Sequence, residues 1–147
     1  MQVIFQGLQI MPCDEKKRRS LCPVTFALDQ VGDKWSLLVV RDLMLLGKKT
    51  YGEFLESAEG IATNVLANRL KCLEAGGIIE KARDPENKRR YLYSLTEKGF
   101  DLTPILLEMI RWSAHHDSDA GIPKDFLDMI ENDRERLIAK VRAGMTL

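Results

Sequence analysis

Small hydrogen-bonding side chains recur at helical spacing in the stretch GIATNVLANRLKCLEAGGIIE, residues 60–80. Its apolar residues follow the period of one helix face, and the double glycine at 76–77 is typical of a left-handed helix end. The positions that point away from the apolar face are Thr63, Asn64, Ala67, Asn68 and Lys71. Asn, Thr and Lys can hydrogen-bond to base edges in a DNA groove, where a small alanine allows close approach. An ordinary solvated helix surface carries the same residue types, so both interpretations stay open for this stretch alone.

Basic side chains follow directly, where the apolar period changes from helical to alternating. Residues 78–96 predict two short strands around the turn-forming DPEN at 84–87. The hairpin residues that could meet a phosphate backbone are Arg83, Lys88, Arg89 and Arg90. A charged run alone is more often a solvated surface. A helix pair followed by a basic hairpin is the more specific pattern of a winged helix-turn-helix, in which the second helix enters the major groove.

The elements that must position these side chains are mostly helices. Apolar periodicity predicts four helices before the hairpin, at residues 23–31, 34–46, 51–57 and 64–75. The expected N-caps of the last three are Asp33, Thr50 and Thr63. The fold class is therefore mostly α with a small β-hairpin (α+β).

Two long helices are predicted after the hairpin. The first opens at Thr96, and Pro104 inside it predicts a kink or a fresh start. Residues 124–142 predict one continuous amphipathic helix. The apolar residues that should be buried against the core or against a partner are Ile105, Leu106, Met109, Trp112, Phe126, Ile130 and Leu137.

The composition is that of a globular protein whose charge is local rather than overall. The chain has 147 residues, of which 45% are hydrophobic, and 22 basic residues balance 22 acidic ones. This length fits one domain with a modest core. No apolar run approaches the roughly 20 residues of a membrane-spanning helix, and no cleavable leader pattern is present, so we expect a cytoplasmic protein without a membrane partner. Part of MQVIFQGLQI at 1–10 resembles a protease-cleavage linker, and we assign it no function.

Three cysteines could carry redox chemistry. Cys13, Cys22 and Cys72 have no C-x-x-C spacing, which gives no zinc signature and predicts free thiols rather than a disulfide framework. Cys13 could pair with Cys22 of the same chain or a partner only if their Cα atoms come within about 7 Å. Cys72 is expected in the core or at its boundary.

Cys22 is the cysteine that we expect to react with oxidants. It precedes Pro23 in the first turn of a predicted helix, where the positive end of the helix dipole favours the thiolate. Arg18 and Arg19 lie close enough in sequence to add to this effect. The alternative is that Cys22 is a small buried residue that packs an interface.

No motif for catalysis or for a cofactor is present. There is no phosphate loop, no G-x-S-x-G and no H-E-x-x-H. His115 and His116 are adjacent, so on a helix they point about 100° apart and do not converge on one metal ion. Asp33 and Asp42 are explained as a cap and a surface residue. We therefore predict neither an enzyme nor a metal or cofactor site.

Several short motifs together resemble the HxlR-type transcriptional regulators, a winged-helix group similar to the MarR type. The resemblance spans 22–112, and its marks are CPV at 22–24, GDKW at 32–35, RDL at 41–43, GI at 60–61, L-x-x-RL-x-x-LE-x-G at 66–76 and Y-x-LTEKG at 93–99. It implies a homodimer on a roughly palindromic double-stranded DNA operator, with the terminal helices forming the dimer interface. It also implies that Cys22, before the PV pair, senses oxidants or electrophiles. After GI the chain departs from the usual pattern with Ala62, Thr63 and Asn64, so we expect an operator of its own.

The resemblance leaves some assignments open. Arg69, in the RL pair, either touches a phosphate or pairs with an internal carboxylate. The expected organisation is a flexible arm at 1–21, a winged helix-turn-helix domain at 22–116 and a dimerisation helix within 117–147. Two other functions remain: a regulator gated by a small-molecule effector with inert cysteines, and a winged helix that binds proteins without DNA.

Overall fold

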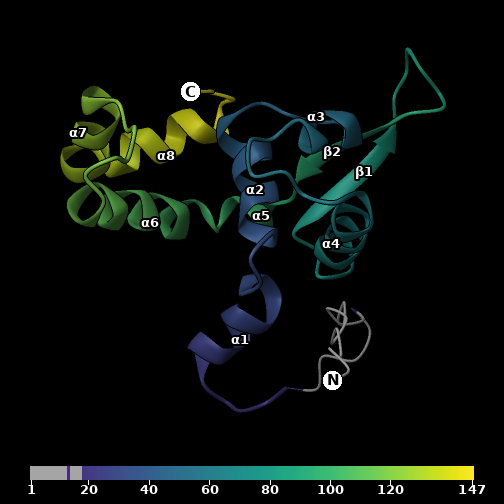
Figure 1. Ribbon diagram of the computed structural model, residues 1–147, viewed down its shortest axis with the longest axis horizontal. Coiled ribbons are helices and arrows are strands. Elements are labelled where there is room, and N and C mark those ends of the chain that lie inside the picture. The colour runs from purple at the N-terminus through teal and green to yellow at the C-terminus, as the bar shows by residue number, and fades with distance from the viewer. Residues whose placement is uncertain (1–12, 14–17) are drawn as a thin grey trace, which may run out of the picture.

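The computed structural model describes residue 13 and residues 18–147 (Figure 1). The linker-like stretch and most of the predicted arm lie outside the described residues. Along the described chain the elements are α1 (Pro23–Val31), α2 (Ser36–Leu45), α3 (Tyr51–Leu55), α4 (Thr63–Ala75), β1 (Ile79–Arg83), β2 (Tyr91–Leu95), α5 (Glu97–Phe100), α6 (Thr103–His116), α7 (Lys124–Asn132) and α8 (Arg134–Arg142).

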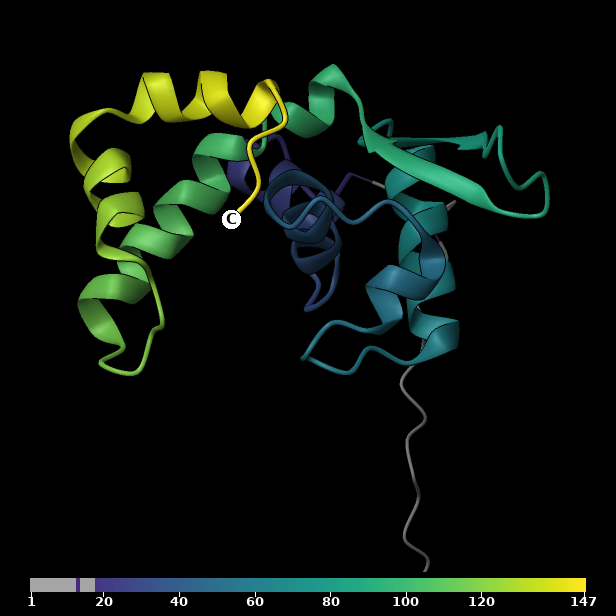
Figure 2. The same cartoon turned by 90° about the horizontal axis from the view of Figure 1, so that it is seen from above.

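Helix α2 stands at the centre of the molecule. The pair α3 and α4 and the hairpin lie on one side of it, and α6, α7 and α8 lie on the other (Figures 1 and 2). Val40 of α2, Leu66 of α4 and Leu107 of α6 are completely buried, so one core runs from the hairpin side to the C-terminal helices. The apolar periods that predicted these helices are therefore the faces that build the core.

Side-chain hydrogen bonds hold the starts of α2 and α3, but not the start of α4. Thr50 is the N-cap of α3, which confirms the prediction, and it forms a capping box with Glu53. The N-cap position of α2 is held by Trp35 and not by the predicted Asp33. The carboxylate of Asp33, three residues before the helix, still accepts hydrogen bonds from the backbone N–H groups of Trp35 and Ser36. Thr63 is the first residue of α4 and not its N-cap, because Ala62 holds the extended N-cap position without a side-chain cap.

The hairpin and its return to the helices confirm the predicted change of period. β1 and β2 pair antiparallel, from Ile79 opposite Leu95 to Arg83 opposite Tyr91. Gly77, with φ of 70°, provides the left-handed residue that turns α4 into β1. A Cβ atom on Gly99 would lie 2.2 Å from the carbonyl oxygen of Ile78, so α5 packs against the backbone directly before β1 at this glycine.

The C-terminal part differs from the prediction in one respect. Pro104 lies in the first turn of α6, which confirms a fresh start there. The continuous helix predicted at 124–142 is wrong, because Asp133 adopts φ −145° and ψ 45° and separates α7 from α8. Asn132 and Asp133 are weak helix formers whose side chains compete for backbone hydrogen bonds. The bend lets both helices bury apolar residues, Ile130 from α7 and Leu137 from α8.

Some apolar residues face solvent in the single chain. Of the seven residues expected to be buried, Leu106, Phe126, Ile130 and Leu137 are buried. The other three lie exposed on α6: Ile105 (41%), Met109 (50%) and Trp112 (61%). Leu21, Val24, Phe26 and Leu28, in and just before α1, are exposed too. Among the described residues no helix is both long and apolar enough to cross a membrane.

Candidate nucleic-acid interface

The outer face of α4 carries the predicted polar set. Thr63, Asn64, Ala67 and Lys71 are exposed to solvent, and Leu66, Leu70 and Leu73 on the opposite face are buried. The hydroxyl of Tyr51 in α3 donates to the carbonyl oxygen of Thr63 at 2.8 Å. This bond ties the first turn of α4 to α3, so the exposed face has a fixed position relative to the helix pair.

Asn68 is the exception in this set. It is half-buried, and its side-chain oxygen accepts hydrogen bonds from the guanidinium of Arg69, at 3.1 Å from Nε and also from Nη2. The same oxygen lies 3.8 Å from the sulfur of Cys72. Asn68 therefore lies at the edge of the exposed face, with its oxygen engaged by neighbours in its own helix.

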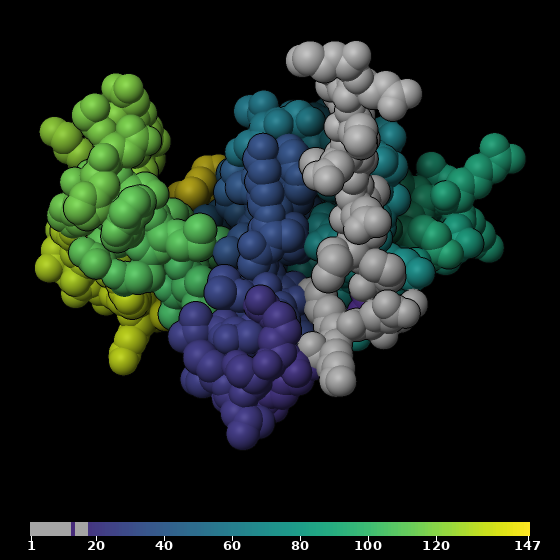
Figure 3. Space-filling view, turned by 60° about the horizontal axis from the view of Figure 1, so that its bottom comes forward, coloured from purple at the N-terminus to yellow at the C-terminus, as the bar shows by residue number. Residues whose placement is uncertain are grey.

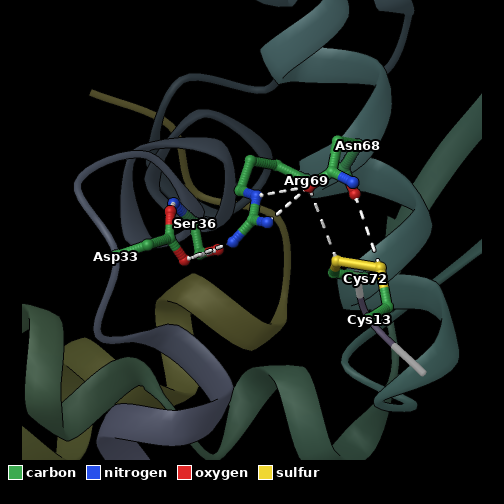
Figure 4. The surroundings of a disulfide bond; sticks show 6 residues. All are labelled: Cys13, Asp33, Ser36, Asn68, Arg69 and Cys72. Carbon is green, nitrogen blue, oxygen red and sulfur yellow. Dashed lines mark hydrogen bonds and ion pairs between the residues drawn. A yellow bond between two sulfur atoms is a disulfide. The ribbon is translucent and has the colours of Figure 1, made fainter. Parts of the chain in front are cut away.

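Arg69 pairs with an internal carboxylate and does not belong to the exposed face. It is only 8% exposed, and its Nη1 lies 3.1 Å from Oδ2 of Asp33 (Figure 4). Burial opposes ionisation of Asp33, but hydrogen bonds from Ser36 and from the backbone of Trp35 prevail and lower the pKa of this carboxyl. Two roles were left open for Arg69. The structure favours the pairing with an internal carboxylate over the contact with a phosphate, because the buried guanidinium anchors α4 to the start of α2.

A buried carboxylate, Asp42, which the sequence suggested is a surface residue, fixes the turn between α3 and α4. Asp42 is 2% exposed and accepts hydrogen bonds from Arg41 at 2.6 and 2.9 Å, from Lys48 at 3.3 Å and from the hydroxyl of Ser57. Arg41 also holds Glu59 at 2.5 Å, and this hydrogen bond lowers the pKa of Glu59 to about 2. A signal for this cluster is Asp42 itself, a carboxylate within the apolar period of α2.

The hairpin divides its four basic residues into two pairs with different roles. The guanidinium of Arg83 lies 4.0 Å from the ring of Tyr91 and donates to the carbonyl oxygen of Lys88 at 3.1 Å. Arg90 donates to the buried Asp84 at 2.5 and 2.9 Å. Hydrogen bonds from the backbone of Glu86 and from Arg90 lower the pKa of Asp84. These two arginines therefore shape the hairpin.

Lys88 and Arg89 form the exposed end of the hairpin. Neither side chain makes an ion pair within the described residues, whereas Arg83 and Arg90 are engaged as above. We define the exposed tip as Lys88 and Arg89. It carries positive charge away from the body of the protein, which is the position from which a wing reaches a phosphate backbone.

Cys22 lies where the sequence predicts, but without help from the arginines. It is exposed in the N-cap position of α1, and hydrogen bonds from the backbone of Thr25 and Val24 lower the pKa of its thiol. Arg19 instead pairs with Asp29 at 2.6 Å, and Arg18 donates to backbone carbonyl oxygens. The helix terminus, and not Arg18 or Arg19, is therefore what favours the thiolate.

The expectation of three free thiols is wrong. Cys13 and Cys72 form a disulfide, with Cα atoms 5.0 Å apart across a sequence separation of 59 residues (Figure 4). Cys22 is free, so the alternative that Cys13 pairs with Cys22 within the chain is also wrong. The sequence could not show this pairing, because only the fold brings the residue before α1 to the flank of α4.

The histidines diverge as expected from neighbours on a helix. His115 contacts Glu131 at 2.8 Å, and the ring of His116 lies 4.8 Å from that of Trp112. Within the described residues no group of three or more His, Cys, Asp or Glu could hold a metal ion.

A cavity of about 330 Å³ lies between α2 and α6, and its lining is mostly apolar, including Leu37, Leu106 and Met109, with Arg41 as the charged residue.

A short helix, a second helix with an exposed polar face and an antiparallel hairpin with a basic tip define a winged helix-turn-helix protein. Residues 30–120 match the family described as HxlR-like helix-turn-helix. The chain belongs to this family of transcriptional regulators.

Individual relatives agree with this assignment. The uncharacterized HTH-type transcriptional regulator sll1512 of Synechocystis is 38% identical over 98 residues, which cover 67% of this chain and 70% of the relative. Among solved structures, the candidate transcription factor PA1607 aligns with a TM-score of 0.65 at 34% identity and covers 72% of each chain. The redox regulator HypR in its oxidized form aligns with a TM-score of 0.58 at 37% identity over 64% of this chain and 96% of that one.

Proposed function

We propose that the protein acts as a homodimer that binds a roughly palindromic double-stranded DNA operator. The observation that carries this proposal is the exposed face of α4, with Asn64, Ala67 and Lys71, on the same side of α2 as the exposed tip. An α-helix fits the major groove, where Asn and Lys read base edges and the tip reaches phosphates beside the groove. We call this exposed face of α4 the reading face; Thr63 and the outer edge of Asn68 extend it. Arg83 and Arg90 support the wing, and the exposed half of Arg90 adds charge there.

The apolar residues exposed on α1 and α6 support the dimer. α1 protrudes from the body of the protein, and its Val24, Phe26 and Leu28 are exposed together with Met109 and Trp112 of α6 (Figure 3). A surface of this kind marks an interaction site more often than a solvated face. A two-fold dimer would place two α4 helices on one side, and palindromic operators match that symmetry.

Cys22 is the candidate site for an oxidant or electrophile in this regulator. Its thiol is exposed, its pKa is lowered at the start of α1, and it lies beside the surface proposed for the dimer. Modification there would place a polar group next to Leu21 and Val24. The relative HypR is named a redox regulator, which supports the same kind of response here.

Genomic-fragment capture tests the DNA proposal. The purified protein is incubated with fragments of its source genome at moderate salt, in parallel with the R89A variant. We expect enriched fragments to share a palindrome, and enrichment to fall in R89A because a phosphate contact is lost. No enrichment by the wild-type protein, with and without a reducing agent, would contradict DNA binding and favour a winged helix that binds proteins.

A second candidate function is gating by a small molecule. The cavity between α2 and α6 is the observation that favours it, because its lining includes Met109 of the proposed dimer surface and Leu37 of α2, the helix on which α4 packs. In that case the response of the protein to oxidants would be unchanged in C22S.

A further inference from the structure

The disulfide between Cys13 and Cys72 lies against the edge of the reading face of α4. The sulfur of Cys13 lies 3.9 Å from the carbonyl oxygen of Asn68, and that of Cys72 lies 3.8 Å from its side-chain oxygen (Figure 4). Cys72 directly follows the exposed Lys71 and lies one helical turn after Asn68. The bond therefore attaches a residue from before α1 to the flank of the helix that we propose reads DNA.

The position of this bond matters because the space around a bound helix is small. The major groove is about 12 Å wide, and a helix with its side chains has a diameter of about 10–12 Å. Cys13, held on the flank by a covalent bond, widens α4 next to Asn68 and Lys71. A free Cys13 can leave the flank, whereas a bonded one cannot.

We propose that Cys13 and Cys72 are a reversible redox site through which a peroxide oxidant attaches the chain before α1 to α4 and lowers the affinity for DNA. This regulation rests on the DNA binding proposed above. It differs from a response at Cys22 in two respects: it needs two cysteines, and the modified element is α4 rather than α1.

The chemistry requires only the two thiols and the oxidant. One cysteine thiolate attacks a peroxide oxygen, the O–O bond breaks, and the cysteine becomes a sulfenic acid while hydroxide takes a proton and leaves as water. The second thiol attacks the sulfenic sulfur, the S–S bond forms, and a second water leaves. Two thiols and one hydrogen peroxide thus give one disulfide and two waters. A dithiol reverses the step by thiol–disulfide exchange and becomes a disulfide itself.

Asn68 links this site to the support of α4. Its side-chain oxygen faces Cys72 and also accepts from Arg69, which pairs with Asp33. Attachment of Cys13 therefore changes the surroundings of a residue at the edge of the reading face, and Arg69 keeps that helix fixed on α2.

Peptide mapping gives the first part of the test and does not depend on DNA. The full chain, as C22S and as wild type, is treated with hydrogen peroxide or with dithiothreitol, alkylated, digested and analysed by mass spectrometry. We expect a Cys13–Cys72 peptide pair within one chain after peroxide and none after dithiothreitol. Free Cys13 and Cys72 after peroxide, or a bond between two chains, would overturn the proposal.

Binding to DNA gives the second part. The probe is a labelled duplex of the fragment most enriched in the capture experiment, measured by fluorescence anisotropy at fixed salt. We expect Kd of C22S to rise at least tenfold after peroxide and to recover with dithiothreitol, and Kd of the C22S/C72S variant to stay constant. An unchanged or lower Kd in C22S with the mapped bond would overturn this regulation alone. A reduced protein that binds no fragment would overturn the proposed function and this regulation with it, whatever the mapping shows.

Discussion

Nη1 of Arg69 lies 3.1 Å from Oδ2 of Asp33, and this ion pair joins the middle of α4 to the start of α2. Asp33 also accepts from the backbone N–H groups that begin α2. One carboxylate therefore caps one helix and holds another. The orientation of the exposed face of α4, the proposed reading face, depends on this ion pair, although neither residue belongs to that face.

Replacing Arg69 should weaken the fold and leave the proposed charge contacts with DNA in place. We expect R69A to lower the free energy of unfolding by about 2 kcal/mol, because the charged hydrogen bonds of a buried guanidinium are lost. Urea denaturation measures this change. The matched control is K71A on the exposed face of the same helix, which should change stability by less than about 0.5 kcal/mol. Equal stability of R69A and wild type would contradict the anchoring role.

Replacing the buried Asp42 should strongly lower the stability of the fold. D42A leaves Arg41 and Lys48 without their buried partner, so we expect a loss of about 3 kcal/mol in the free energy of unfolding. Hydrogen exchange should also be faster at Ser57 in the turn before α4, since its hydroxyl bonds to Asp42. The control is D101A, whose carboxylate is exposed and paired with Arg142 at the surface. A similar effect of both substitutions would refute the role of Asp42 in the turn.

The sequence predicted the elements of this fold better than the partners of its charged residues. The period of α4, the strand alternation and the break at Pro104 are local patterns, and each appears where it was expected. The role of Arg69 was ambiguous because an arginine beside an apolar stripe can face a phosphate or a carboxylate, and its partner Asp33 lies far away in sequence, between α1 and α2.

Residues that meet only in the folded chain account for the remaining errors. The bond between Cys13 and Cys72 closes a separation of 59 residues, which no local spacing encodes. The bend at Asp133 is a balance between helix propensity and the packing of α7 and α8. Contact of Asn64 or Arg89 with DNA stays a prediction, because exposure makes such a contact possible but does not identify it.

Gly99 should tolerate no side chain. A Cβ atom would come within 2.2 Å of the carbonyl oxygen of Ile78, and backbone cannot move as a flexible side chain does. We expect G99A to lower the free energy of unfolding by about 3 kcal/mol, at the upper end for overpacking. Thermal unfolding measures this loss. G52A is the control, because a Cβ atom on Gly52 meets nothing within 4 Å, and it should be neutral or slightly stabilising.

The shape of the wing should depend on pH through Asp84. Its pKa is lowered in the folded protein by the backbone of Glu86 and by Arg90. The stabilising contribution of the carboxylate is therefore fully present above its unfolded pKa, about 3.9, and is lost as the pH falls through the lowered folded value. We expect amide protection in the turn at 84–90 to decrease in that acidic range. The D84N variant should show the reduced protection already at neutral pH, and protection in D84N equal to wild type would contradict this.

The two neighbouring arginines of the wing should behave differently. R89A removes a charge from the exposed tip, so the slope of log K for DNA against log salt should become shallower by about 0.9 while the fold is unchanged. R90A removes the partner of Asp84, so amide protection in the hairpin should fall as well. Salt titrations of DNA binding and hydrogen exchange on both variants distinguish the roles. A shallower slope without lost protection in R90A would make Arg90 a phosphate contact only.

The exposed indole of Trp112 should decide whether the protein dimerises. The ring is 61% exposed next to Met109 on α6, and a charge there could not be buried against a second chain without a partner. We expect W112E to sediment as a monomer, with thermal unfolding similar to a dilute wild-type sample. L46E is the control, because Leu46 is 41% exposed but lies outside α1 and α6, and it should stay dimeric. A monomeric W112E should also bind DNA about 100-fold more weakly, since one α4 in place of two loses the gain from simultaneous contact with both half-sites. If W112E remains a dimer, the interface lies elsewhere and the two-fold arrangement of the α4 helices has to be revised.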